Sequence, residues 1–271
     1  REIVFEGLKL TEEKLKTVNR IEIVACGSAY HAGMVGKYVL EEMLRIPTSI
    51  DYASEYRYRN PIVDDKTLTI IISQSGETAD TLAALKEAKK RGSHTLSIVN
   101  VVGSSIANAS DDVIYTWAGP EIAVATTKGY TTQLSVIYLI AVWAARILKT
   151  MDSDRVEKIF DDICRLPELI EKVILSEPKI KEMAKHCGDP KSLFFIGRNI
   201  DYAVSLEASL KLKEISYIHS EAYAAGELKH GTISLIEEGR TVIALAAYEG
   251  LFEKLLSNVK EVKARGAYVI A

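Results

Sequence analysis

Short apolar runs alternate along the chain with longer segments in which apolar residues recur every three or four positions. The runs are typical of buried strands, and the periodic segments are typical of helices with one buried face. We predict strands at residues 21–25, 68–72, 94–101 and 112–117, and helices at residues 30–44, 79–91 and 131–148. Because strands and helices alternate, the pattern predicts an α/β fold with a parallel sheet between layers of helices.

The same pattern returns in the second half of the chain. The apolar run 193–198 repeats the first strand and the glycine that follows it, and residues 240–271 align with residues 66–97. A repeat of this size indicates two copies of one supersecondary unit. We therefore predict tandem three-layer αβα subdomains, the first at residues 1–151 with an N-terminal extension and the second at residues 152–271 with a helical connection at its start.

Two features lead us to expect that the chain is part of a longer protein. It starts at Arg1 without a methionine, and its second copy stops on its third strand at Ala271, where the first copy continues with a further strand, a loop and a long helix. The connection between the copies, residues 152–186, is rich in charged residues. We predict it to be helical, with breaks at Pro167 and Pro178.

Composition and charge exclude several classes of protein. The net charge of −3 gives no reason to expect nucleic acid or an anionic membrane as a partner. The most apolar segment, residues 134–148, is too short to span a bilayer and contains Arg146, so we predict a buried helix there. The three widely spaced cysteines fit a reducing cytoplasm, and no Cys/His spacing resembles a metal site. We expect a cytoplasmic protein without a metal.

The most informative stretch is Ser73-Gln74-Ser75-Gly76-Glu77-Thr78, called the donor loop below. It connects a predicted strand to a predicted helix, and therefore lies where ligands bind in parallel α/β sheets. Its hydroxyl and amide donors, with the N–H groups of the helix's first turn, favour an anion, whereas helix capping needs only one hydroxyl. Because the chain has no Gly-x-Gly-x-x-Gly or Gly-Lys-Ser/Thr motif, we predict a site for a small phosphorylated metabolite.

The second copy lacks this group of donors. Its aligned positions hold no serine or threonine, and only Gly76 is retained, as Gly250. Glu249 places a carboxylate where an anion would bind in the first copy. Phosphate binding is therefore predicted for the first subdomain alone.

A second candidate loop, residues 118–128, also connects a predicted strand to a predicted helix. We call it the threonine loop, because Thr126 and Thr127 are able to bind ligand hydroxyls or to cap the following helix. Its small residues leave room for a ligand, and its position predicts that it reaches the same end of the sheet. Taken alone, capping is the simpler interpretation.

Two neighbouring segments of the second copy suggest acid–base chemistry. In the predicted helix 203–219, Glu207, Lys211 and Glu214 fall on one face. They form either a solvated ion-pair surface or part of a site. The next segment combines small residues, two acids and His230, one of five histidines. Together Glu214 and His230 would supply a base and an acid for sugar chemistry.

These segments resemble a known family. The matching stretches are Cys26-Gly27-Ser28, Ser73 to Thr81, Val124 to Lys128, Lys211 to Ser216 and Glu227 to Gly231. Together they resemble the isomerase domains of the glucosamine-6-phosphate synthase family, which consist of tandem sugar isomerase (SIS) subdomains. The donor loop alone is typical of the wider SIS family, whereas residues 221–231 are much more specific to the synthases.

The resemblance implies a role for each candidate residue. Eight positions would bind the substrate through its phosphate or its sugar: Ser73, Gln74, Ser75, Thr78, Gly27, Ser28, Val124 and Thr126. Glu214 would move a proton between C1 and C2, and Lys211 would belong to the same site. His230 would assist ring opening and would come from the neighbouring subunit of a homodimer.

The resemblance also implies the reaction. Fructose 6-phosphate would be converted to glucosamine 6-phosphate without a cofactor, with ammonia from a glutaminase domain that is not among these residues. Without that domain and the family's C-terminal tail, we expect a poorly active fragment. Three departures accompany the match: Ala29 replaces a hydroxyl residue on the phosphate side, Thr126 replaces a serine, and Thr232 replaces a proline.

Two alternatives remain open at this point. One is a sugar-phosphate sensor that binds and does not catalyse, and the other is a related SIS aminosugar isomerase or deglycase without a glutaminase half. A sensor needs the donor loop but has no use for a proton-transferring carboxylate. Glu214 and His230 therefore favour an enzyme.

Overall fold

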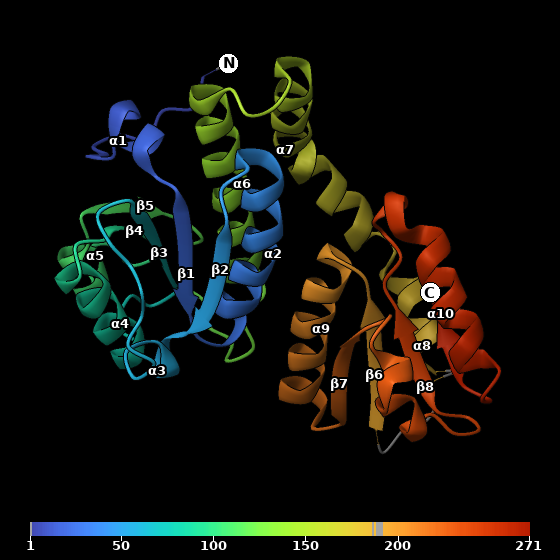
Figure 1. Ribbon diagram of the computed structural model, residues 1–271. Helices are drawn as coiled ribbons and strands as arrows, with labels where there is room; N and C mark the ends of the chain where they lie inside the picture. The colour runs from blue at the N-terminus through green and yellow to red at the C-terminus, as the bar shows by residue number, and fades with distance from the viewer. Residues whose placement is uncertain (1, 186, 188–191) are drawn as a thin grey trace. The chain divides into compact units, whose positions relative to one another are not determined.

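The structure, a computed structural model, describes residues 2–185, 187 and 192–271. The chain divides into two units, Arg1–Cys164 and Arg165–Ala271, and each contains its own parallel sheet (Figure 1). The α/β fold predicted from the alternating pattern is confirmed in both units.

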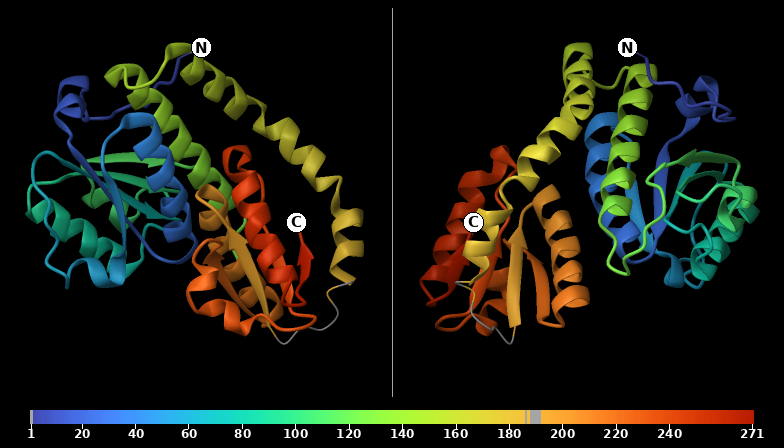
Figure 2. Two further views of the ribbon diagram at one scale, coloured as in Figure 1. Left: turned by 45° about the vertical axis from the view of Figure 1, so that its right-hand side comes forward. Right: turned by 180° about the vertical axis from the view of Figure 1, so that it is seen from behind.

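Unit 1 is a parallel five-stranded sheet between two layers of helices, with the strand order β2-β1-β3-β4-β5 (Figures 1 and 2). The strands are β1 (Arg20–Ala25), β2 (Thr48–Tyr52), β3 (Thr67–Ser73), β4 (His94–Val99) and β5 (Asp112–Tyr115). The helices are α1 (Glu12–Thr17), α2 (Gly27–Leu44), α3 (Ala53–Tyr56), α4 (Ala79–Lys90), α5 (Ser105–Ala109) and α6 (Lys128–Leu148).

The two faces of this sheet are covered by different helices, because successive residues of a strand point to opposite faces. α2 and α6 cover the face that carries Ile23, and α3, α4 and α5 cover the face that carries Val24 and Ile71. All seven residues of β3 and all six of β4 are buried, as expected for central strands with helices on both sides. Ligands therefore reach these strands at their ends.

α6 is the one described helix that is long and apolar enough to cross a membrane, judged by length and composition. It packs, however, as a core helix of unit 1. Ile137, Ile140 and Ala141 are buried, and α6 lies alongside α2 in all views (Figures 1 and 2). The buried helix predicted at residues 134–148 is confirmed, and it starts earlier, at Lys128.

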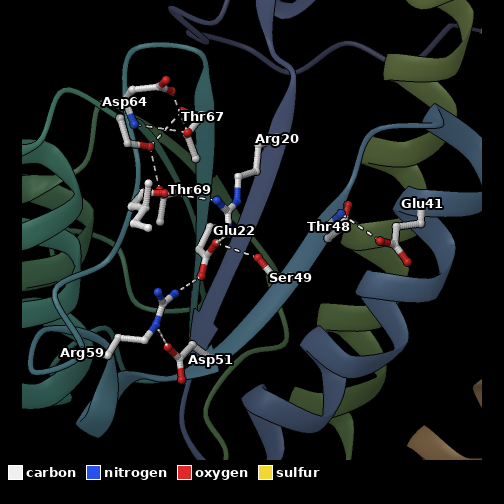
Figure 3. A network of polar contacts seen from close by, with 12 residues as sticks. Arg20, Glu22, Glu41, Thr48, Ser49, Asp51, Arg59, Asp64, Thr67 and Thr69 are labelled. Carbon is white, nitrogen blue, oxygen red and sulfur yellow. Dashed lines mark hydrogen bonds and ion pairs between the residues drawn. The ribbon is translucent and has the colours of Figure 1, made fainter.

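A network of charged side chains links β1, β2 and the turn after α3 (Figure 3). The Glu22 carboxylate is 1% exposed and accepts hydrogen bonds from Arg59 and from the Ser49 hydroxyl, the latter at 2.6 Å. Arg20 lies 3.4 Å from the same carboxylate, and Arg59 also donates to Asp51. The network therefore ties the edge strand β2 to the centre of unit 1.

Replacing Arg59 with methionine is expected to lower the free energy of unfolding by about 1–3 kcal/mol, because Glu22 stays buried and loses a directly bonded cation. The value is below that of a fully buried pair, since the Arg59 side chain is 39% exposed. Urea unfolding followed by circular dichroism measures the change. Arg57→Met, which removes an exposed neighbouring guanidinium, is the control. An equal decrease in the free energy of unfolding in both variants would contradict this role for Arg59.

Unit 2 repeats the strand order of unit 1. Its parallel sheet has the order β7-β6-β8-β9, which corresponds to β2-β1-β3-β4. The strands are β6 (Ser192–Gly197), β7 (His219–Ala224), β8 (Thr241–Ala244) and β9 (Tyr268–Ile270). The helices are α7 (Ser153–Ile174), which begins in unit 1, α8 (Glu177–Lys185), α9 (Ile200–Ser216) and α10 (Phe252–Lys263), with the 3-10 turns η1 (Leu228–His230), η2 (Thr232–Leu235) and η3 (Glu249–Leu251). The predicted repeat is confirmed.

The helical connection differs from the prediction at one proline. α7 continues through Pro167, so the predicted break there is wrong. A proline ring removes one backbone hydrogen bond. The remaining backbone hydrogen bonds of this 22-residue helix are sufficient to keep it continuous. Pro178 lies in the first turn of α8, where a missing N–H costs no helical bond. His186, the predicted end of the stretch, lies outside the described residues.

Candidate functional site

The donor loop after β3 is folded by its own side chains. The Ser73 hydroxyl oxygen accepts a hydrogen bond from the Gly76 N–H at 3.1 Å, and the Ser75 oxygen accepts one from the Glu77 N–H at 3.2 Å. Accepting these bonds leaves each hydroxyl with its own proton to donate. Thr78 is the N-cap residue of α4 and makes no side-chain capping bond. An anion at the start of α4 would therefore meet hydroxyl donors as well as backbone N–H groups.

Gln74 lies between the donor loop and α6. Its side-chain oxygen is 3.5 Å from the amide nitrogen of Gln133, which is 2% exposed. The amide nitrogen of Gln74 is buried and has no hydrogen-bond partner among the described residues. A buried donor without an acceptor costs about 1–3 kcal/mol. An anion bound to the loop would recover that cost.

Contacts with the segment around α5 fasten the donor loop in place. The Gly76 carbonyl accepts from the Ile106 N–H at 2.9 Å, and the Glu77 carboxylate accepts from the Ser105 N–H at 2.8 Å. Hydrogen bonds from the Ser105 side chain and backbone lower the pKa of Glu77. Gly76 has φ +69°, and a Cβ there would collide with the Ser104 side chain. Both the conformation and the available space therefore require glycine at this position.

Gly76→Ala is expected to weaken phosphate binding about tenfold or more, because relieving the collision with Ser104 shifts the loop at a cost of about 1–3 kcal/mol. Gly103→Ala is the matched control, since Gly103 has φ +74° but open space where its Cβ would be. Calorimetric titration with inorganic phosphate measures both variants, and thermal unfolding checks that both fold. Equal affinities for the two variants would contradict the prediction.

The first strand brings a further pair of predicted residues to the donor loop. β1 pairs with β3 in parallel, with Ala25 opposite Ile72, so Gly27 and Ser28 follow β1 beside the donor loop. Gly27 has φ +55° and begins α2. The structure thus places the two predicted phosphate-binding segments at the carboxyl ends of neighbouring strands.

The threonine loop is held by Glu121, a residue for which the sequence pattern predicted no role. The Glu121 carboxylate accepts hydrogen bonds from the Thr126 hydroxyl at 3.0 Å and from the Gly129 N–H at 3.1 Å, and the bond from Gly129 is the main cause of a lowered pKa of Glu121. A Cβ on Gly129 would lie 3.0 Å from the side-chain carbon of Gln74, so this loop adjoins the donor loop. Val124, which was predicted to contact the sugar, lies in the same loop and is 97% exposed. Glu121 lies well before residue 131, where the helix was predicted to begin, so no local sequence signal marked it.

α9 carries the acid–base candidates of unit 2 on one face. Lys211 Nζ is 3.4 Å from a carboxylate oxygen of Glu207 and bonds the Glu214 carboxylate directly. The exposed fraction of the side chain rises from 6% for Glu207 to 18% for Lys211 and 32% for Glu214. No group of three or more His, Cys, Asp or Glu side chains suited to a metal occurs in the described part of the chain. The cluster is therefore an ion-pair group with Glu214 at its solvent side.

His230 ends the short turn η1 that follows β7. Its backbone N–H donates to the Glu227 carbonyl at 2.9 Å, and the residue is exposed. Within the residues described, the imidazole makes no hydrogen bond or ion pair. The structure therefore does not join His230 to Glu214 by a direct contact.

The loop of unit 2 that aligns with the donor loop binds a carboxylate of the protein itself. Tyr248, which aligns with Gln74, donates its backbone N–H to Asp201 at 2.9 Å, and Asp201 is 6% exposed. Glu249, the acid predicted from the alignment, lies in this loop as the first residue of η3, and the first turn of α9 contributes Asp201 as a further carboxylate. In unit 2 the backbone N–H of Tyr248 is therefore already bonded to a carboxylate of the protein. The equivalent residue of unit 1, Gln74, lies in the donor loop.

Similar proteins are found by sequence. The chain matches the SIS domain family over residues 14–143 and 188–271. It is 58% identical over 270 residues to a glutamine–fructose-6-phosphate aminotransferase (isomerizing) of Caldanaerobacter subterraneus subsp. tengcongensis, and 54% identical over 270 residues to the one of Clostridium tetani. Each match covers 100% of this chain and 44% of the relative, so the chain spans less than half the length of these relatives.

Similar proteins are also found by structure. The C-terminal domain of glucosamine-fructose-6-phosphate aminotransferase from Francisella tularensis matches with a TM-score of 0.94 and 38% identity, covering 99% of this chain and 75% of that one. Glucosamine-6-phosphate deaminase from Thermotoga maritima matches with a TM-score of 0.78 and 27% identity, covering 98% and 79%. The names of all four relatives refer to the 6-phosphate of a sugar.

Proposed function

The chain belongs to the SIS domain family, alongside the C-terminal domain of glucosamine-fructose-6-phosphate aminotransferase, and from this premise we propose that it is the isomerase part of such an enzyme. Its proposed substrate is fructose 6-phosphate and its proposed product is glucosamine 6-phosphate. In this proposal unit 1 binds the phosphate, and unit 2 supplies the groups that move protons.

The donor loop is the observation that carries the proposal. A phosphate dianion is best held by several N–H and O–H donors. The loop offers the hydroxyls of Ser73, Ser75 and Thr78 and the buried, unpartnered amide nitrogen of Gln74. Because this chain has a net charge of −3, attraction for a phosphate must come from local donors of this kind. Ser28 adds a further hydroxyl beside the loop.

The proposed reaction replaces an oxygen at C2 by nitrogen and moves two protons, one from C1 to C2 and one from the C1 hydroxyl to the nitrogen. Ammonia adds to the C2 carbonyl of open-chain fructose 6-phosphate and water leaves, which gives an imine. A base removes a proton from C1 while the imine nitrogen takes up a proton, which gives an enolamine. A proton is then delivered to C2 and the C1 hydroxyl gives up its own proton, so that C1 becomes an aldehyde and C2 carries the amine. C1 is oxidised as C2 is reduced, so the electrons balance within the sugar.

We propose that Glu214 is the base, because it is the carboxylate on the solvent side of the α9 cluster. One carboxylate is able to serve both steps, since C1 and C2 are adjacent. Lys211, which bonds Glu214, balances the charge of the carboxylate. The exposed imidazole of His230 is proposed to move the proton that ring opening requires, and Val124 and Thr126 to contact the sugar.

Two partners belong to this proposal. A glutaminase domain would supply the ammonia, which is supported by the names of the relatives and by the 44% of their length that this chain spans. A second copy of the chain would supply His230 in a homodimer, which is supported by the exposure of that residue.

Loss of an isotope label from C1 tests the proposed function. Fructose 6-phosphate with deuterium at C1 is incubated with the protein and ammonia in ordinary water, and NMR follows the label at C1 and C2. We expect deuterium to leave C1 only when the protein is present. A sugar phosphate that binds and keeps its label would contradict the proposal and favour the sensor.

A further inference from the structure

Glu207 is a buried carboxylate that the proposed reaction does not use. It lies one helical turn before Lys211 on α9, and its side chain is only 6% exposed. Burying a charged carboxylate is costly unless a cation is near. The ammonium of Lys211, 3.4 Å from a Glu207 oxygen, is such a cation. Lys211 is therefore shared between one carboxylate on the buried side and one on the solvent side.

The charges in this cluster change when Glu214 acts as a base. Before the reaction, Lys211 is bonded to the Glu214 carboxylate. When Glu214 turns toward the sugar and takes a proton, it becomes neutral and no longer balances the charge of Lys211. The Lys211 side chain is only 18% exposed, so an unbalanced ammonium would be poorly solvated. A second carboxylate that remains in place removes this penalty.

We propose that Glu207 is a positioning residue for the proton transfer, an inference that rests on the proposed function. Its carboxylate holds the Lys211 ammonium at the buried side of the cluster and remains its counter-ion while Glu214 leaves and accepts the proton. Without Glu207, Lys211 has Glu214 as its one carboxylate partner in the cluster, and the ion pair locks the base. Glu207 thus acts through Lys211 and does not touch the sugar.

A double-mutant cycle between Glu207 and Lys211 tests this inference. Glu207→Gln is expected to slow loss of deuterium from C1 about 10–100-fold and to change KM less than about threefold, because the loss is confined to the proton-transfer step. In the Lys211→Met background, Glu207→Gln is expected to have no further effect on the rate, because the residue through which it acts is gone. Glu207→Asp keeps the charge and is expected to retain more activity than Glu207→Gln.

The control variant is Glu87→Gln on α4, which removes a half-buried acid from another helical pair, with Arg91, outside the site. It is expected to leave the rate unchanged. If Glu207→Gln unfolds, the Glu207→Gln/Lys211→Met double variant, which removes both charges, is compared with Lys211→Met alone. Equal slowing by Glu207→Gln in both backgrounds, or no slowing at all, would overturn the inference. An unmodified protein that removes no label from C1 would overturn the proposed function as well.

Discussion

Replacing Glu214 with glutamine is expected to slow loss of deuterium from C1 of fructose 6-phosphate by about 10²–10⁴-fold, the usual contribution of a general base. Glutamine has nearly the same size as glutamate and cannot accept the proton. The change removes a negative charge beside Lys211 and leaves the donor loop of unit 1 untouched. NMR of the labelled sugar at saturating substrate measures the rate.

The control for this prediction is Glu253→Gln on α10, which removes an exposed acid from another helix of unit 2. It should exchange label at the rate of the unmodified protein. A Glu214→Gln variant that keeps the unmodified rate would remove Glu214 from the mechanism. A rate lowered equally by both substitutions would point to net charge as the cause.

Fructose 6-phosphate is expected to bind about 100-fold or more tightly than fructose, because hydrogen bonds to a charged group contribute about 1.5–3 kcal/mol each and the donor loop offers several. The buried amide nitrogen of Gln74 adds a donor that has no partner among the described residues. Isothermal titration with each sugar measures the two dissociation constants.

A matched pair of variants separates the donor loop from general effects on binding. Ser75→Ala removes one exposed donor of the loop and should narrow the affinity gap between the two sugars. Ser176→Ala, in the turn between α7 and α8, should leave the gap unchanged. Equal affinity of the unmodified protein for fructose and fructose 6-phosphate would show that the donor loop does not bind phosphate.

The sequence pattern predicted the central strands and missed one edge strand of each sheet, β2 and β7, for a physical reason. Strands such as β3 are buried on both faces, so their residues form a continuous apolar run. β2 (Thr48–Tyr52) and β7 (His219–Ala224) lie at the edges of their sheets and carry polar residues among the apolar ones. Alternation alone does not separate such strands from loops.

The candidate site was predictable where several donors stand together in the sequence. Ser73, Ser75 and Thr78 are close in the chain, and the fold keeps them together at one strand end. Glu121 acts through a bond to an N–H eight residues later, which only the folded loop reveals. Asp201 contacts Tyr248 across 47 residues, and no local pattern records such a contact.

The central claim is that phosphate binding and proton transfer are performed by different units of the chain. The dissociation constant of fructose 6-phosphate for the Glu214→Gln variant tests it most directly. We predict a value within about threefold of that of the unmodified protein, since an interaction made only in the transition state does not contribute to substrate binding. A variant that loses binding together with proton transfer would contradict the division between the two units.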